Sequence, residues 1–394
     1  MSFATESGPE NVVTIKVVGV GGAGNNVVNR MVKSGTQGIE YVAVNTDKQA
    51  LAVSSADQKI QIGEKLTHGQ GAGSDPDVGK RSAEESRNNI AKSLENADMV
   101  FITAGMGGGT GTGAAPTIAD IAREAGILTV GVVTKPFKFE GKRRMDQAMV
   151  GINELLGKVD SLLIIPNDRL KFATDQKVTL ANAFEIADDV LRQAVVSISD
   201  LIKNTGFINL DFADVTCVMK DAGFAHMGVG RAASKGKAED AARMAVASPL
   251  METSINGARG VLINITGSED MGLEDVETAA NLVQEAAHPD ANIIFGASFD
   301  PSLDDEIRVS VIATGFDEPG KAQAEAAPAA AAAPAAAPAA GMYTAAATAA
   351  TAAPAAAPAP AAAPAAPAAA PAADAAAPAE EDPFDSIFKI FNSK

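Results

Sequence analysis

The chain has little of what extracellular, zinc-binding or membrane-spanning proteins need. Its 394 residues include one cysteine, Cys217, which excludes an internal disulfide and a cysteine-based zinc cluster and is typical of a reducing compartment. Cys217 lies in the strand-like run 215–219, where we expect it to be buried. The first eleven residues have no basic or apolar segment, so we expect no signal peptide. We expect a cytoplasmic protein.

Long apolar runs and positive charge are also scarce. No charge-free apolar run of about 20 residues occurs outside a tract of Ala and Pro, whose prolines prevent a continuous spanning helix, so we expect no direct membrane insertion. The 32 Lys and Arg residues are outnumbered by 49 Asp and Glu residues, and the net charge of -17 argues against nucleic acid as a partner. Any anion that the chain binds must be held locally.

Strand-like and helix-like segments alternate from residue 12 onward. Short β-branched runs at 12–20, 41–45, 99–103, 127–133 and 161–166 are separated by longer amphipathic stretches that end near residues 33, 94, 125 and 156. Strands that are apolar on both faces and alternate with helices predict an α/β fold with a doubly wound parallel sheet. Ligands bind such sheets where strands end and helices begin.

A long helical pattern at 179–204 separates this region from a second, smaller α/β domain. There we expect strands at 215–219, 260–266, 292–297 and 308–314, with helices near 235–247 and 273–286. The predicted organisation is a disordered N-terminus at 1–11, a nucleotide domain at 12–178, the central helix at 179–204 and a second domain at 205–316.

The last 78 residues are expected to form a tail. Residues 317–381 are almost all Ala and Pro, cannot bury enough surface to fold and predict a disordered linker. In residues 382–394, Phe384, Ile387, Phe388 and Phe391 follow helical spacing after a possible cap at Asp382. A disordered spacer that ends in an amphipathic segment suggests a docking peptide.

Two glycine clusters stand at strand-to-helix junctions. The first, at Gly19 to Gly24, formally matches GxGxxG, and with Asp47 it leaves open a dinucleotide site. The second, GMGGGTGTGAAP at 105–116, precedes a helix that we expect to begin near Ala114, and a dehydrogenase would not need it. Glycines expose backbone N–H groups and helix N-termini favour anions, so the two loops predict a polyphosphate site without the lysine of a Walker A loop. A third loop, at 71–79, can add backbone donors.

Five motifs resemble the FtsZ family, the tubulin-like GTPases of bacterial cell division. They are GGAGNN at 21–26, AVNTD at 43–47, GMGGGTGTGAAP at 105–116, PFKFEGKRR at 136–144 and NLDFADV at 209–215. The similarity extends from about residue 12 to 314. It implies a GTPase that polymerises head to tail, a central helix, a C-terminal domain, a linker and a terminal peptide.

The resemblance implies a set of GTP-binding residues. The residues that would lie against the nucleotide's phosphates are Gly21, Gly22, Ala23, Gly24, Asn25, Gly107, Gly108, Gly109, Thr110, Gly111, Thr112 and Gly113, and Asn45 would also bind the nucleotide. The terminal phosphate and Mg²⁺ would lie near Ala72 and Gly73. Glu140 and Arg144 would meet the ribose and nucleoside, and Phe184 would stack on the base. A carboxylate at Asp189 suits guanine, because it can accept hydrogen bonds from N1–H and N2–H.

The resemblance also implies catalysis between subunits. Asn209, Asp211 and Asp214 would enter the nucleotide site of the next subunit, where the carboxylates polarise the attacking water and Asn209 orients it. Two carboxylates near a triphosphate require cations, so Mg²⁺ and K⁺ are implied, without a metal site made of protein side chains.

The family further implies a ring at the division septum and partners that tether or regulate it through the terminal peptide. Here the peptide reads DPFDSIFKIFNSK, which departs from the usual family core and leaves the tether open. Two alternatives are a dinucleotide-dependent oxidoreductase and a scaffold that binds nucleotide without hydrolysing it. The second glycine cluster argues against the first, and the intact residues 209, 211 and 214 argue against the second.

Overall fold

A computed structural model of the chain describes residues 13–316, except 37, 173–177, 180–181, 204–207, 209, 234–235, 252–254, 269, 301–302 and 304. The segments expected at 1–11, 317–381 and 382–394 and the catalytic candidate Asn209 lie outside the described residues. None of the helices in the described part of the chain has the length and apolar character needed to span a bilayer.

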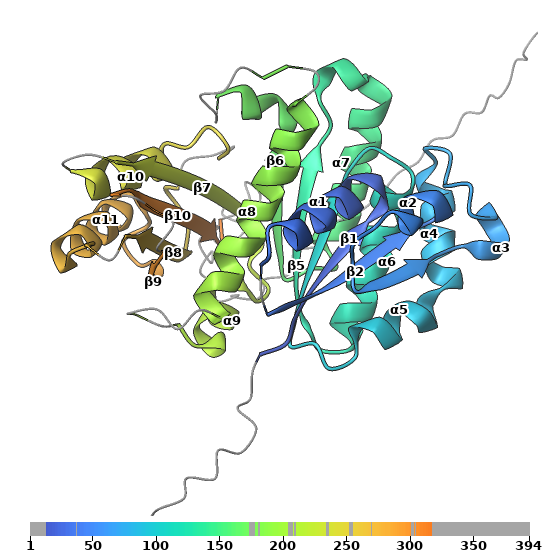
Figure 1. Ribbon diagram of the computed structural model, residues 1–394, viewed down its shortest axis with the longest axis horizontal. Coiled ribbons are helices and arrows are strands. Elements are labelled where there is room, and N and C mark those ends of the chain that lie inside the picture. Colours follow the sequence, from blue (N-terminus) through green and yellow to red (C-terminus); the bar gives the residue numbers. More distant parts are fainter. Residues whose placement is uncertain are drawn as a thin grey trace, which may run out of the picture. The chain divides into compact units, whose positions relative to one another are not determined.

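Ten strands form one sheet in the order β3-β2-β1-β4-β5-β6-β7-β10-β8-β9 (Figure 1). The neighbours from β3 to β7 are parallel, β10 is antiparallel to β7 and β8, and β9 is parallel to β8. The strands are β1 (Ile15–Val20), β2 (Ile39–Asn45), β3 (Gln58–Gln61), β4 (Met99–Gly105), β5 (Leu128–Lys135), β6 (Ser161–Pro166), β7 (Gly223–Ala232), β8 (Gly260–Gly267), β9 (Asn292–Phe299) and β10 (Ile307–Thr314).

Helices cover both faces of the parallel part of the sheet. Helices α1 and α8 pack on one face, and α5, α6 and α7 pack on the other, so β1 and β4 are buried on both sides as the apolar runs predict (Figure 1). The helices are α1 (Gly21–Lys33), α2 (Lys48–Ala52), α3 (Glu64–Thr67), α4 (Pro76–Glu85), α5 (Arg87–Leu94), α6 (Thr110–Glu124), α7 (Lys142–Leu156), α8 (Ala183–Lys203), α9 (Phe212–Met219), α10 (Lys237–Val246) and α11 (Leu273–Ala286), with short 3₁₀ turns η1 (Lys138–Glu140) and η2 (Asn167–Phe172).

The central helix, α8, runs across the sheet from the side where the parallel strands end to the side where they begin. Near its start, the ring of Phe184 meets Phe137, just after β5 ends, and at its last residue Lys203 lies against Gly38, just before β2 begins. Its 21 residues span about 31 Å. The chain is thereby carried from the carboxyl ends of the parallel strands to their amino ends.

The expected strand at 215–219 is wrong, because these residues form α9. Asp211 caps the helix by accepting a hydrogen bond from the N–H of Asp214 at 2.8 Å, and this local bond outweighs the β-branched composition. Cys217 is exposed, which also corrects the expectation that it is buried.

The strand of this region is instead β7, which the sequence pattern did not predict. Its glycines obscure the pattern, and they are there because α10 lies directly on the strand. A Cβ at Gly228 or Gly230 would stand 1.9 Å from a carbonyl oxygen of α10. Parallel pairing of 161–163 with 223–225 joins β7 to β6, so the strands before and after α8 form one continuous sheet.

Candidate functional site

The two glycine clusters meet at the carboxyl ends of the parallel strands. Val20 at the end of β1 is in register with Val44 of β2 and with Ala104 of β4. The loops that follow these strands therefore leave the sheet side by side. The two loops are in close contact, since a Cβ on Gly21 of the first would lie 3.0 Å from the backbone nitrogen of Gly111 in the second.

Each of the two loops runs directly into a helix. Helix α6 begins at Thr110 and not near Ala114 as expected, so Gly111 and Gly113 belong to its first turn. Neither N-cap residue, Val20 of α1 or Gly109 of α6, makes a side-chain hydrogen bond to the helix, and neither first turn holds an acidic residue. The first-turn N–H groups and the positive ends of both helix dipoles are thus available to one anion.

Open space lies above two of the glycines. A Cβ at Gly22 or Gly108 would have no heavy atom within 4 Å, whereas one at Gly109 would be 2.9 Å from the Cβ of Ala72. The third glycine loop is held beside Gly109 because the helix that follows it, α4, packs on α6. This packing is tight, since a Cβ on Gly113 would lie 1.9 Å from the carbonyl oxygen of Pro76. The structure therefore brings Ala72 and Gly73 to the two main loops.

Polar side chains brace these loops. The Thr46 and Thr110 hydroxyls lie 2.7 Å apart, and Thr112 accepts a hydrogen bond from the Gly107 N–H at 2.8 Å. Asn25 and Asn45 are both buried; with the Asn25 amide oriented to satisfy its neighbours, its nitrogen donates to the Gly19 carbonyl at 2.8 Å and its oxygen accepts from Asn45 at 3.1 Å. Thr112, Asn25 and Asn45 thus fix the shape of the loops.

The loop after β5 supplies the next group of expected residues. Glu140 accepts a hydrogen bond from the Phe137 N–H at 2.9 Å and pairs with Arg144 one helical turn later. Phe137 packs edge-on against Phe184 with ring centroids 5.5 Å apart, and the Phe184 side chain is 47% exposed. An exposed aromatic ring at the start of α8 can stack on a base.

The two adjacent carboxylates of α8 have different surroundings. Asp189 accepts hydrogen bonds from Arg192 at 2.8 Å and Gln193 at 2.6 Å, both on its own helix. Asp188 is 8% exposed and faces α1, where Arg30 Nε lies 3.4 Å from its carboxylate. Burial raises the pKa of Asp188 to about 6, although Arg30 opposes this shift.

The two carboxylates also differ in exposure. The Asp189 side chain is 44% exposed, whereas the Asp188 side chain is 11% exposed and lies against Arg30. A base stacked on Phe184 can reach the exposed carboxylate more easily, and the role of Asp189 in reading guanine stays a prediction.

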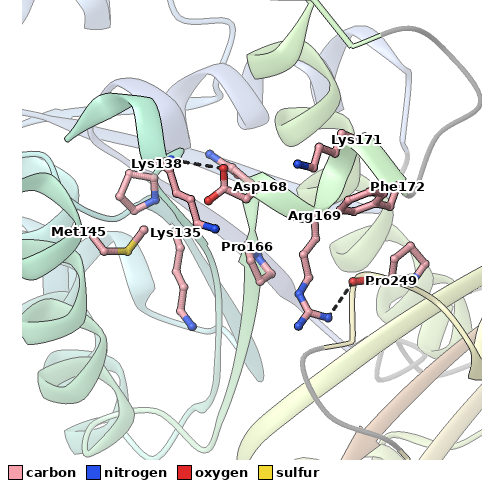
Figure 2. A pocket seen from close by; sticks show the side chains of 11 residues that line it. Lys135, Lys138, Met145, Pro166, Asp168, Arg169, Lys171, Phe172 and Pro249 are labelled. Atoms are coloured by element: carbon pink, nitrogen blue, oxygen red, sulfur yellow. Dashed lines mark hydrogen bonds between the residues drawn. The ribbon is translucent and has the colours of Figure 1, made fainter. Parts of the chain in front are cut away.

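A pocket of about 480 Å³ lies beside the loop after β5 (Figure 2). Four of its lining residues are cationic, namely Lys135, Lys138, Arg169 and Lys171, and Arg169 is anchored to the Pro249 carbonyl at 3.2 Å. Figure 2 shows Lys138 and Asp168 side by side, joined by a hydrogen bond from the Lys138 N–H.

Asn167, which follows β6, also lines this pocket. It is 5% exposed, and its Oδ1 has no hydrogen-bond partner. A buried amide oxygen without a partner at the carboxyl edge is a further candidate for contact with a ligand, and it was missed because nothing in the local sequence distinguishes it.

Asp211 and Asp214 lie at the opposite edge of the sheet. The last residue of α9, Met219, accepts a hydrogen bond at 2.6 Å from Ser161, the first residue of β6, so α9 stands at the amino ends of the strands (Figure 1). The six residues of β6 alone separate the two edges by about 20 Å. Both carboxylates are exposed and too far away to act on a ligand held by the glycine loops of the same chain.

Comparisons with known proteins agree over most of the described chain. Residues 14–175 match the Tubulin/FtsZ family, GTPase domain, and residues 223–317 match the FtsZ family, C-terminal domain. The chain is similar to an empty FtsZ dimer of M. jannaschii, with 46% identity and a TM-score of 0.74 over 77% of this chain and 88% of that one. A mutant FtsZ of the same organism matches at 45% identity and a TM-score of 0.75, over 77% and 91%. The GTPγS-bound CetZ2 protofilament of Haloferax volcanii, 21% identical with a TM-score of 0.65 over 79% and 96%, shares the fold.

Proposed function

Because the chain belongs to the FtsZ family of tubulin-like, filament-forming GTPases, we propose that it builds the bacterial cell-division ring and hydrolyses GTP between successive subunits. The observation that carries this proposal is the separation of the two halves of the site. The glycine loops occupy the carboxyl edge of the sheet, and Asp211 and Asp214 occupy the amino edge. A head-to-tail contact brings one edge onto the other and propagates without closing.

In this proposal the carboxyl edge holds GTP. The β- and γ-phosphates take the open space over Gly22 and Gly108, facing the first-turn N–H groups of α1 and α6, with residues 71–73 near the terminal phosphate. The base stacks on Phe184 and is read by Asp189, while Glu140 and Arg144 contact the ribose. Adenine lacks the N1–H and N2–H donors that a carboxylate needs, so guanine is preferred.

The amino edge of the next subunit completes the reaction. Asp211 and Asp214 accept hydrogen bonds from a water molecule held between them and the γ-phosphate, and Asn209 orients it. The water oxygen forms a bond to the γ-phosphorus, the bond from that phosphorus to the GDP oxygen breaks, and the water proton passes to a carboxylate. Hydrolysis therefore follows assembly.

Mg²⁺ and K⁺ are part of the proposal. Over the residues that the structure describes, no group of three His, Cys, Asp or Glu side chains could hold a metal ion. Mg²⁺ is commonly bound through phosphate oxygens and water, and we infer the same here. When bound, it neutralises charge that develops on the phosphates.

The tail completes the assignment. We infer that residues 382–394 dock onto membrane-tethering and regulatory partners at the division septum and that residues 317–381 act as the spacer. Composition supports this role, since three of the chain's few aromatic residues are concentrated in the last eleven positions.

The experiment that tests this function is GTP hydrolysis per subunit as a function of protein concentration, in Mg²⁺ and K⁺. We expect almost no activity below a threshold, a steep rise above it and no activity at any concentration in Asp214→Ala, which still binds GTP. A rate per subunit that does not change with concentration would mean a self-contained site and would refute the proposal.

A further inference from the structure

Helix α9 is short, and its two ends have different surroundings. Its N-terminal end carries Asp211 as the cap and Asp214 in the first turn, both exposed. Its C-terminal end is buried, with Met219 at 0% exposure and Val218 at 5%. The orientation of the exposed carboxylates is therefore set by whatever holds the buried end.

Two hydroxyl groups hold that end. Ser161 Oγ donates to the Met219 carbonyl at 2.6 Å, and Thr314 Oγ1 donates to the Val218 carbonyl at 3.0 Å. Both side chains are buried, Ser161 at 0% and Thr314 at 1% exposure. The last carbonyls of a helix lack partners within it, so these bonds satisfy groups that would otherwise be unpaired.

The two hydroxyls come from different parts of the sheet. Ser161 begins β6, in the strands before the central helix, and Thr314 ends β10, in the strands after it. Packing is tight here as well, since a Cβ on Gly260 at the start of β8 would lie 2.9 Å from the Val218 side chain. Helix α9 is thus fixed from both sides.

We propose that Ser161 and Thr314 are positioning residues, which set the direction of α9 and so aim Asp211 and Asp214 at the nucleotide of the next subunit. This inference rests on the proposed function. Eight residues of helix span about 12 Å, and a tilt of about 5° about the buried end would displace the carboxylates by about 1 Å. A displacement of that size can cost about a hundredfold in rate.

The test uses the full-length chain and two substitutions at one position. Thr314→Val keeps the shape of the side chain and removes the hydroxyl, and Thr314→Ser keeps the hydroxyl. For each variant, kcat is measured per sedimented, polymerised subunit at saturating GTP, together with KM and GTP binding by the unassembled protein.

We expect Thr314→Val to lower kcat per polymerised subunit by tenfold or more, with KM and GTP binding changed less than twofold and with Thr314→Ser close to wild type. A general loss of structure would instead reduce GTP binding and polymer yield together. Unchanged kcat in Thr314→Val, or an equal loss in Thr314→Ser, would overturn the inference.

A second position keeps the test decisive if the Thr314→Val variant does not fold. If Thr314→Val does not bind GTP, Ser161→Ala is held to the same expectation, with Ser161→Cys as the variant closest in size. Asp214→Ala is assayed in parallel. If Asp214→Ala keeps wild-type kcat, the proposed function fails; if it is inactive while the hydroxyl variants hydrolyse GTP normally, only the positioning role fails.

Discussion

Replacing Asp189 by Asn should remove most of the chain's selectivity for guanine nucleotides. The substitution keeps the size of the side chain and removes one hydrogen-bond acceptor and the negative charge. Asp188→Asn is the matched control, because it makes the same change at the preceding position, where the carboxylate is buried beside Arg30 of α1.

The magnitude follows from the two hydrogen bonds that an ionised carboxylate would accept from the base. Bonds to charged groups contribute about 1.5–3 kcal/mol each, and an asparagine amide can accept only one of the two. The loss of about 3 kcal/mol in binding free energy corresponds to about a hundredfold in Kd. Asp188→Asn should change Kd for GDP less than threefold.

The dependence on pH separates the two carboxylates. Burial raises the pKa of Asp188 to about 6, so this group changes charge between pH 7.5 and pH 5. GDP affinity of the wild type relative to Asp188→Asn should stay constant over this range, because Asp188 does not contact the base. The ratio to the variant removes titration of the nucleotide itself.

The titration of Asp188 should instead change the stability of the fold. The folded-state pKa of about 6 exceeds the ordinary value of 3.8, so folding favours the protonated form of Asp188. The free energy of unfolding of the wild type, relative to Asp188→Asn, is greatest below about pH 4 and falls by about 3 kcal/mol as the pH rises to about 6. Denaturant titrations of both proteins at pH 4 and pH 7 measure this difference.

Calorimetric titrations with GDP at pH 5, 6 and 7.5 identify which of the two carboxylates contacts the base. If Asp188→Asn weakens GDP binding by about a hundredfold while Asp189→Asn leaves it unchanged, the assignment of the base contact to Asp189 is refuted.

Three further predictions concern the glycine loops and the cap of α9. Gly108→Ala points its Cβ into open space, so the melting temperature should stay within about 2 °C of wild type while GTP affinity falls at least tenfold, as measured by thermal unfolding and nucleotide titration. Gly113→Ala should unfold the chain or lower its melting temperature strongly, because its Cβ would stand 1.9 Å from the Pro76 carbonyl oxygen; a stable variant would contradict the close packing of α4 and α6. Asp211→Asn should keep the helix cap and lose hydrolysis, whereas Asp211→Ala should also lose about 1 kcal/mol of stability in denaturant unfolding; equal stability of the two would show that the cap contributes little.

The parallel part of the fold could be predicted from the sequence because its signals are local. Each of the five expected strands before the central helix is present, and both glycine clusters lie at strand-to-helix junctions as expected. Buried parallel strands read as short apolar runs, and the glycines that approach a ligand or a neighbouring helix are dense enough to be noticed. The order of these five strands was therefore accessible without tertiary information, whereas β3, a short strand with exposed residues, was not predicted.

The errors arose where distant contacts decide the local structure. Residues 215–219 are rich in β-branched side chains, yet they form a helix because Asp211 caps its start and the buried Ser161 and Thr314 hydroxyls donate hydrogen bonds to its last carbonyls. Strand β7 is rich in glycine because α10 lies on it. In the same way, the burial of Asp188 depends on Arg30 of another helix, which no local pattern reports.

The most direct test of the shared active site mixes two proteins that are each inactive. Wild-type protein is held below its assembly threshold, and Asp214→Ala, with intact glycine loops, is added in excess together with GTP. We predict that hydrolysis appears on mixing, because wild-type α9 then acts on GTP held by the neighbouring variant subunit. If the mixture is as inactive as its components while filaments form, the site is not completed by the next subunit and the account is wrong.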